Sequence, residues 1–199
     1  MSTAPQKKYT FEEYLALEEV AEYRSEFYRG EIFAMTGGTP QHDRICVNLT
    51  ISLGSQLKGK KCELFSANQR TSISKLSLFT YPDISIVCDG PKFDVADKNS
   101  ITNPRIIFEV LSPSTEMYDR GKKFSFYRQL SSLTEYILVS QDEPQIERFV
   151  RNQEDSWLLT ITKGLESSVT LETIQCRLLL ADVYDRVTFE PVNPVSPVP

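Results

Sequence analysis

Two short apolar runs in the middle of the chain each carry one carboxylate. The first covers residues 84–88 and directly follows Asp83; the second covers residues 106–111 and contains Glu109. In a strand, side chains alternate between two faces, and both faces of the second run are apolar apart from Glu109. Because an isolated buried charge is costly, each carboxylate should be paired, hydrogen-bonded or bound to a metal.

Helices are predicted where apolar positions recur every three or four residues. Thr10 and Glu13 form a capping-box pattern that begins a helix over residues 11–19. Apolar side chains four residues apart mark one face of a second helix, over residues 41–58. A third helix is expected over residues 116–130, although Gly121 weakens its first turn.

Strands are predicted by alternating or continuous apolar residues between turn signals. They cover residues 31–35, 62–65, 70–74, 84–88, 106–111, 135–140, 145–151 and 157–162, with short strands within 169–190. Residues 28–31 read as a turn and residues 89–104 as a loop. This order favours an α/β (α+β) fold in which helices pack on a mixed or antiparallel sheet, followed by extra antiparallel C-terminal strands.

Length and composition are those of an ordinary globular domain. Hydrophobic residues make up 40% of the 199 positions and charged residues 25%. We expect one domain over residues 1–190 and a mobile tail over 191–199, which holds four of the eleven prolines. The chain shows neither a signal-peptide core nor an apolar run long enough to span a bilayer, so we expect a cytoplasmic protein without a membrane partner.

Charge and cysteine content narrow the chemistry. The net charge of −5 argues against a protein that coats nucleic acid through a large basic surface, but it does not exclude a nuclease. The cysteines are scattered, no C-x-x-C occurs and His42 is the single histidine, which disfavours a structural zinc site. We therefore expect buried, reduced thiols at Cys46, Cys62, Cys88 and Cys176.

The carboxylates Asp83 and Glu109 can meet at one edge of the sheet if their strands are neighbours. Two carboxylates, with a backbone carbonyl such as that of Val110 and water, suit a hard cation such as Mg²⁺ or Mn²⁺. On the third predicted helix, Lys123 shares a face with Asp119 and Tyr127, four residues to either side. Lys122 points about 100° away. We favour Lys123 as the lysine that faces the carboxylates.

Three stretches carry a resemblance to a known family. They are Tyr81-Pro82-Asp83, then Glu109-Val110-Leu111-Ser112-Pro113-Ser114-Thr115, then Tyr118-Asp119-Arg120-Gly121-Lys122-Lys123-Phe124, with His42 and the segments 30–32 and 136–139 in addition. The chain resembles the Uma2 family of restriction endonucleases, within the PD-(D/E)xK nuclease superfamily, from about residue 10 to residue 190.

The resemblance implies an αβββαβ core, a divalent-metal site and hydrolysis of DNA phosphodiester bonds. It implies metal ligation by Asp83 and Glu109. The superfamily lysine is expected two residues after the glutamate, where this chain has Leu111. The family places that lysine on the following helix, where it would correspond to Lys123.

Two further candidates stay open. Glu31 could supply another acidic ligand, because an N-terminal glutamate often does so in this superfamily, and it could equally be a surface strand residue; Glu26 is a weaker candidate for the same role. His42 could contact phosphate or assist proton transfer, and it could equally cap the second helix or fill a gap. The candidate catalytic residues are thus Asp83, Glu109, Lys123, Glu31 and His42.

Three functions are compatible with these residues. The first is a metal-dependent DNA endonuclease that acts as a homodimer, since cutting both strands is simplest with two sites. The second is a nuclease-fold binding or regulatory module without turnover, because the superfamily lysine is displaced. The third is a structural scaffold, in which the carboxylates and Lys123 form only an ion network.

Overall fold

The computed structural model describes residues 7–35 and 37–189, and the predicted tail at 191–199 lies outside these residues. Its elements are α1 (Phe11–Val20), β1 (Ser25–Tyr28), β2 (Glu31–Ala34), α2 (Pro40–Leu57), β3 (Cys62–Ser66), β4 (Arg70–Ile73), η1 (Ser74–Leu76), β5 (Leu78–Thr80), β6 (Ile84–Cys88), β7 (Ser100–Ile101), β8 (Ile106–Val110), α3 (Glu116–Tyr118), η2 (Asp119–Lys123), α4 (Phe124–Tyr127), β9 (Glu135–Val139), β10 (Gln145–Arg151), β11 (Trp157–Lys163), β12 (Ser168–Leu171), η3 (Glu172–Ile174), β13 (Cys176–Leu179) and α5 (Leu180–Val183).

Six strands form a large mixed sheet in the order β11-β10-β9-β8-β6-β3. Only β8 and β9 run parallel within it, and α3, η2 and α4 connect them. The succession α2, β3, β6, β8, α3–α4, β9 has the αβββαβ order that the resemblance implied, with β4, β5 and β7 inserted between core strands. The prediction of a mixed sheet flanked by helices, with extra C-terminal strands, is confirmed.

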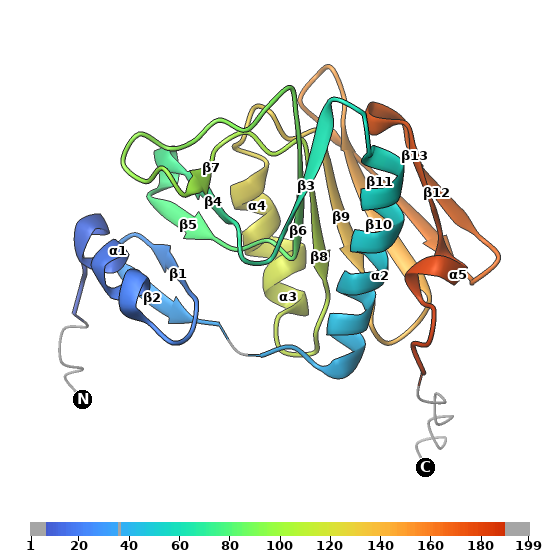
Figure 1. Ribbon diagram of the computed structural model, residues 1–199, viewed down its shortest axis with the longest axis horizontal. Coiled ribbons are helices and arrows are strands. Elements are labelled where there is room, and N and C mark those ends of the chain that lie inside the picture. The colour runs from blue at the N-terminus through green and yellow to red at the C-terminus, as the bar shows by residue number, and fades with distance from the viewer. Residues whose placement is uncertain (1–6, 36, 190–199) are drawn as a thin grey trace, which may run out of the picture.

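Each face of the large sheet is covered by helices (Figure 1). One face packs against α2, the β12–β13 hairpin and α5 in a core that includes Ile106, Phe108 and Val110. The other face packs against α4 in a second hydrophobic core, to which Ile107 of β8 belongs. All of β8 is buried, so the sequence-based conclusion that neither face meets water is confirmed.

A small sheet in the order β2-β1-β5-β4-β7 lies on the far side of α4 from the large sheet (Figure 1). Its β1–β2 hairpin turns at Arg29 (φ 49°) and Gly30 (φ 89°), as predicted for residues 28–31. Such a two-residue turn with both φ angles positive matches the twist of a hairpin. The predicted loop 89–104 contains the two-residue strand β7, which pairs with β4.

The helices begin where the sequence predicts. Thr10 and Glu13 form both hydrogen bonds of the capping box of α1, and Thr39 caps α2 by accepting a hydrogen bond from the backbone of His42. The four apolar residues on the predicted face of α2 are buried. The third predicted helix is shorter than expected: it ends at Tyr127, and its middle, η2, is a π-helix that contains Gly121.

The expectation of four reduced cysteines was wrong for two of them. Cys62 and Cys88 form a disulfide, while Cys46 and Cys176 are free; of these two thiols Cys176 is buried as expected, whereas Cys46 is only half-buried. The cysteines face each other across β3 and β6, next to a pair in which the N–H of Asp89 bonds the carbonyl of Lys61. They thus occupy a non-hydrogen-bonded position, where cross-strand side chains approach most closely. Only the register reveals this proximity, since the cysteines are 26 residues apart.

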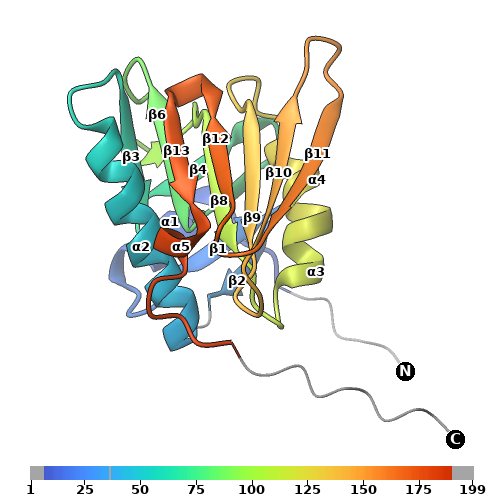
Figure 2. The same cartoon turned by 90° about the vertical axis from the view of Figure 1, so that its right-hand side faces the viewer.

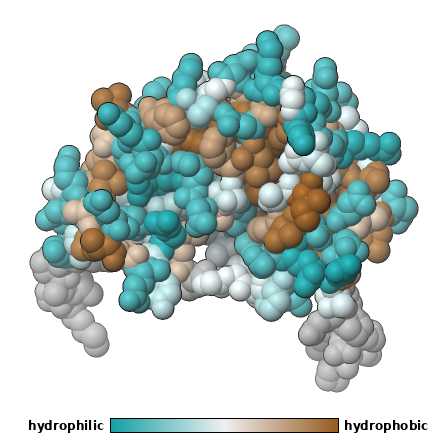
Figure 3. Space-filling model, in the orientation of Figure 1, coloured by the Kyte–Doolittle hydropathy of each residue, from teal (hydrophilic) through white to brown (hydrophobic). Residues whose placement is uncertain are grey.

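The surface of the molecule is uneven in hydropathy. In Figure 3 hydrophobic residues gather over α2, where Val47 and Ile51 are exposed, whereas the side of the small sheet is mainly hydrophilic. Among the residues that the structure describes, no helix has the length and apolar composition needed to cross a bilayer.

Candidate active site

The register of β6 and β8 brings the two predicted acids to one edge of the large sheet. Ile84 pairs with Phe108 in the antiparallel ladder of β6 and β8. Asp83 directly precedes Ile84 and Glu109 directly follows Phe108, so the two acids lie side by side. The backbone N–H of Val110 donates to Asp83 Oδ2 at 2.7 Å. Asp83 is thus fixed to the strand that carries Glu109.

Lys123 completes the pair from the helical connection. Its Nζ lies 2.9 Å from Glu109 Oε1 and 3.5 Å from Asp119 Oδ1. Tyr127, one turn further on, donates its hydroxyl to Glu109 Oε1 at 2.9 Å. The sequence-based prediction that these three helix residues share a face toward Glu109 agrees with this geometry. Lys122 lies elsewhere, with its ammonium over the ring of Tyr28.

The charges of this cluster are strongly coupled because it is buried. Burial raises the pKa of Glu109 well above its usual range, against the attraction of Lys123, and the charges of Asp83 and Asp119 add to the rise. Burial opposes the charged form of Lys123, but its carboxylate neighbours outweigh burial and raise its pKa. One ammonium therefore does not neutralise the surrounding carboxylates.

His42 approaches the same centre from the start of α2. Its Nε2 lies 3.2 Å from Asp83 Oδ2, and its Nδ1 lies 3.7 Å from the thiol of Cys46. Burial disfavours the imidazolium, yet the hydrogen bond and charge of Asp83 prevail and raise the pKa of His42. The cap of α2 is the side chain of Thr39, so the imidazole is free to act in the cleft.

Of the two N-terminal glutamates, Glu26 reaches the site. Its Oε1 lies 3.7 Å from Lys123 Nζ and accepts a hydrogen bond from the hydroxyl of Thr80. Glu31 lies on the same face of the hairpin, but near the turn, opposite Tyr28, and it does not line the cleft described below. Thr80 was not anticipated; its position just before Tyr81-Pro82-Asp83 was the available signal.

A cleft of about 480 Å³ lies at this centre, between the two sheets. Four carboxylates (Glu26, Asp83, Glu109 and Asp119) face it, together with the basic side chains of Lys123 and His42. One wall of the cleft is apolar and includes Phe33, which lies in β2, and Met35, which directly follows β2. Phe33 pairs with Glu26 across the hairpin, so an exposed aromatic ring adjoins the acidic centre.

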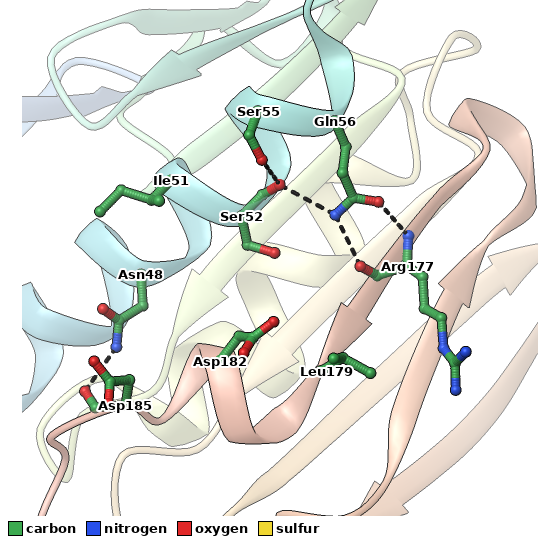
Figure 4. A pocket seen from close by; sticks show the side chains of 9 residues that line it. All are labelled: Asn48, Ile51, Ser52, Ser55, Gln56, Arg177, Leu179, Asp182 and Asp185. Atoms are coloured by element: carbon green, nitrogen blue, oxygen red, sulfur yellow. Dashed lines mark hydrogen bonds between the residues drawn. The ribbon is translucent and has the colours of Figure 1, made fainter.

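A second groove, of about 600 Å³, lies between α2 and the β13–α5 segment (Figure 4). Asn48 donates to the carbonyls of Val183 and Asp185, each at 3.0 Å. Gln56 exchanges two hydrogen bonds with the backbone of Arg177, both 2.8 Å. The polar side chains of this groove connect α2 to the C-terminal segment, and its lining contains no cluster of interacting titratable groups. The cleft around Asp83 and Glu109 is therefore the better candidate site.

The cleft suits a divalent cation of the hard type. Carboxylate oxygens are the ligands that Mg²⁺ and Mn²⁺ prefer, and the excess of carboxylates over cations is what such an ion would neutralise. His42, Cys46 and Asp83 also offer ligand atoms within 4.8 Å of one another. Burial raises the pKa of the Cys46 thiol and thereby opposes the thiolate that a softer metal would bind.

Comparison with known proteins shows a family and a fold for the chain. The Uma2 profile, described as "Putative restriction endonuclease", matches residues 11–181. Two uncharacterized proteins of Synechocystis sp. are similar: sll1609 is 34% identical, covering 85% of this chain and 96% of the relative, and slr1290 is 38% identical, covering 79% and 82%. A crystal structure titled a putative nuclease belonging to DUF820, from Anabaena variabilis, superposes with a TM-score of 0.73 at 17% identity, covering 90% of this chain and 99% of that chain.

Proposed function

The chain belongs to the Uma2 family, and from that premise we propose that it is a divalent-metal-dependent endonuclease that hydrolyses DNA phosphodiester bonds. The observation that carries the proposal is the contact of 2.9 Å between Lys123 Nζ and Glu109 Oε1, beside Asp83. Lys123 thereby takes the place of the superfamily lysine, whose usual position is occupied by Leu111 in this chain.

In this proposal Asp83 and Glu109, with the backbone of Val110, hold Mg²⁺ or Mn²⁺. A bound divalent cation would supply Lewis-acid stabilisation of the phosphate and lower the pKa of a water molecule. The raised pKa of Glu109 fits such a ligand, because a cation favours its ionised form.

Lys123 assists the attacking water and the negative charge that develops on the phosphate. Glu26 and Asp119 hold the ammonium in place, since both carboxylates lie within 4.0 Å of it. Tyr127 orients Glu109 through its hydroxyl. His42, bonded to Asp83, can exchange a proton or contact a phosphate oxygen at the mouth of the cleft.

A nuclease-fold module without turnover is the alternative, because Lys123 could serve only to neutralise buried carboxylates. The two functions differ in metal binding and in chemistry. An inactive module of this kind would neither bind Mg²⁺ at Asp83 nor cut DNA, although it could retain a DNA or protein partner.

Plasmid nicking with Mg²⁺ or Mn²⁺, with and without chelator, tests the proposal. We expect metal-dependent cleavage that falls at least about 100-fold in Asp83→Ala and Glu109→Ala, because each loses a metal ligand. Glu63→Ala, at an exposed acid on β3, is the matched control and should cut normally. Cleavage that survives in Asp83→Ala, or no cleavage with either metal, would refute the proposal. If no cleavage occurs, calorimetry with Mg²⁺ tests the inactive alternative, which predicts that Mg²⁺ does not bind at Asp83.

We further propose that the active species is a homodimer. Each chain carries one cleft with one set of carboxylates. Two copies related by a two-fold axis would present two such clefts, one for each strand of a duplex.

A further inference from the structure

The edge of the large sheet formed by β11 lacks the features that usually prevent an edge strand from pairing with another strand. β11 is its last strand, and among the described residues it pairs only with β10 (Figure 2). Three apolar side chains on it are exposed: Leu158 at 65%, Leu159 at 43% and Ile161 at 55%. Edge strands are usually protected by proline, bulges or several charges, because their free backbone groups attract other strands. β11 has no proline and its single charge, Lys163, is its last residue.

Two hydrogen bonds reveal which backbone groups of β11 are free. The N–H of Asn152 bonds the carbonyl of Ser156 at 2.9 Å, and the N–H of Gly164 bonds the carbonyl of Pro144 at 3.0 Å. Hydrogen-bonded pairs recur every second residue in an antiparallel ladder, so the even-numbered residues of β11 bond to β10. The N–H and C=O groups of Trp157, Leu159 and Ile161 therefore point outward.

We propose that β11 is the interface between two copies of this chain, which pair antiparallel about a two-fold axis at Thr160 and join their large sheets into one. This register pairs the whole seven-residue strand. Leu159 of each copy lies opposite Ile161 of the other, and both present outward backbone groups to exchange hydrogen bonds. The apolar side chains that are exposed in one chain are covered by their counterparts.

Charge placement favours this partner over an unrelated strand. In the register centred on Thr160, Lys163 lies opposite Trp157 of the second copy rather than opposite another lysine. Lys163 pairs with Glu143 of its own chain, and the guanidinium of Arg151 already lies over the ring of Trp157. The advantage of this register is therefore that like charges, which destabilise a ladder, are not directly opposite. The strand thus complements itself, as a two-fold interface requires. This inference rests on the homodimer of the proposed function, but not on catalysis.

Sedimentation analysis of the full chain, without DNA or metal, tests the association and is independent of any nuclease assay. We expect a dimer that Ile161→Lys weakens by about tenfold or more, because it places a charge in the apolar centre of the interface. Ile51→Lys, at a similarly exposed position on α2, should leave the dimer unchanged. Circular dichroism verifies that both variants fold. A monomer at all soluble concentrations, or a dimer insensitive to Ile161→Lys, would overturn the proposal.

Cysteine cross-linking tests the register. Thr160 would face its own counterpart at a non-hydrogen-bonded position, the same kind of position at which Cys62 and Cys88 are bridged. Thr160→Cys should therefore form an intermolecular disulfide under mild oxidation. Thr162→Cys should not cross-link alone, but should do so when mixed with Leu158→Cys. Cross-linking of Thr162→Cys to itself, or none in Thr160→Cys, would rule out this register; the unsubstituted chain gives the background from its free cysteines.

Discussion

Asp83 accepts a hydrogen bond of 2.7 Å from the backbone N–H of Val110, the residue that follows Glu109. This bond joins the end of one strand to the carboxylate-bearing part of its neighbour. The carboxylate of Asp83 is thereby anchored to the main chain of the strand that carries Glu109, which limits the movement of one acid relative to the other. A site built on strand backbones holds its ligands more precisely than one built on loops.

Replacing Lys123 should separate its role from that of Lys122. We expect Lys123→Met to lower the cleavage rate about 100- to 1,000-fold, because it removes charge stabilisation at the phosphate. Single-turnover cleavage of plasmid at saturating Mg²⁺ measures the effect. Lys122→Met should stay within about twofold, since the ammonium of Lys122 lies over the rings of Tyr28 and Phe126 and Lys122 does not line the cleft. Equal losses in the two variants would contradict the assignment.

Glu26 and Glu31 provide a second matched pair. Glu26→Gln should lower cleavage about 10- to 100-fold, because the carboxylate holds Lys123 in position. Glu31→Gln should cut normally, since Glu31 does not line the cleft. The same plasmid assay applies, with thermal unfolding to verify that both variants fold. A larger loss in Glu31→Gln would instead assign the acidic role to Glu31.

Reduction of the Cys62–Cys88 disulfide should destabilise the chain. Closing a loop of 26 residues limits the unfolded state, and such links contribute about 2–4 kcal/mol to the free energy of unfolding. Urea unfolding with and without reductant measures the difference. Cys46→Ser should respond to reductant as the natural chain does, whereas Cys62→Ser should not respond. Equal stability in both conditions would contradict the prediction.

Asp94 should contribute to stability in a pH-dependent way. Burial acts to raise its pKa, but hydrogen bonds from the hydroxyls of Ser72 and Ser74, both 2.6 Å, and from backbone amides prevail and lower it. A depressed pKa in the folded state means that the contribution is complete above the unfolded value of about 3.9 and is lost as the pH falls through the folded value.

Urea unfolding of Asp94→Asn between neutral and acidic pH measures this contribution. The difference from the natural chain should be largest at neutral pH and should shrink below about pH 4. Asp142→Asn, at an exposed position, should show no such convergence. A difference that does not change with pH would show that Asp94 acts through its shape rather than its charge.

Much of the fold and the centre of the site could be predicted from the chain itself. The spacing on α2 fixes its buried face, and the buried carboxylate in β8 demands a partner, which is Lys123. Four-residue spacing also predicts that Tyr127 joins it, because helix geometry is local. The family resemblance supplied the link between Asp83 and Glu109 before their strands were known to be neighbours.

The remaining features depend on strand register, which local patterns do not determine. Whether Glu26 or Glu31 reaches the site depends on how β1 pairs with β2 and where β1 packs against α4. Thr80 enters the site only because β5 lies beside β1. The Cys62–Cys88 contact likewise exists only in one register of two strands separated by other elements.

The small sheet is assembled from two segments that are distant in the chain, the hairpin before α2 and the strands inserted between β3 and β8. It provides one wall of the cleft, including Phe33 and Glu26, while the large sheet provides Asp83 and Glu109. Under the proposed function, Phe33 of the small sheet would influence what enters the cleft, Asp83 and Glu109 would hold the metal, and Glu26 would connect the two parts by positioning Lys123. Under that function, substitutions at exposed positions such as Phe33 could change what enters the cleft while Glu26, Asp83 and Glu109 stay unaltered.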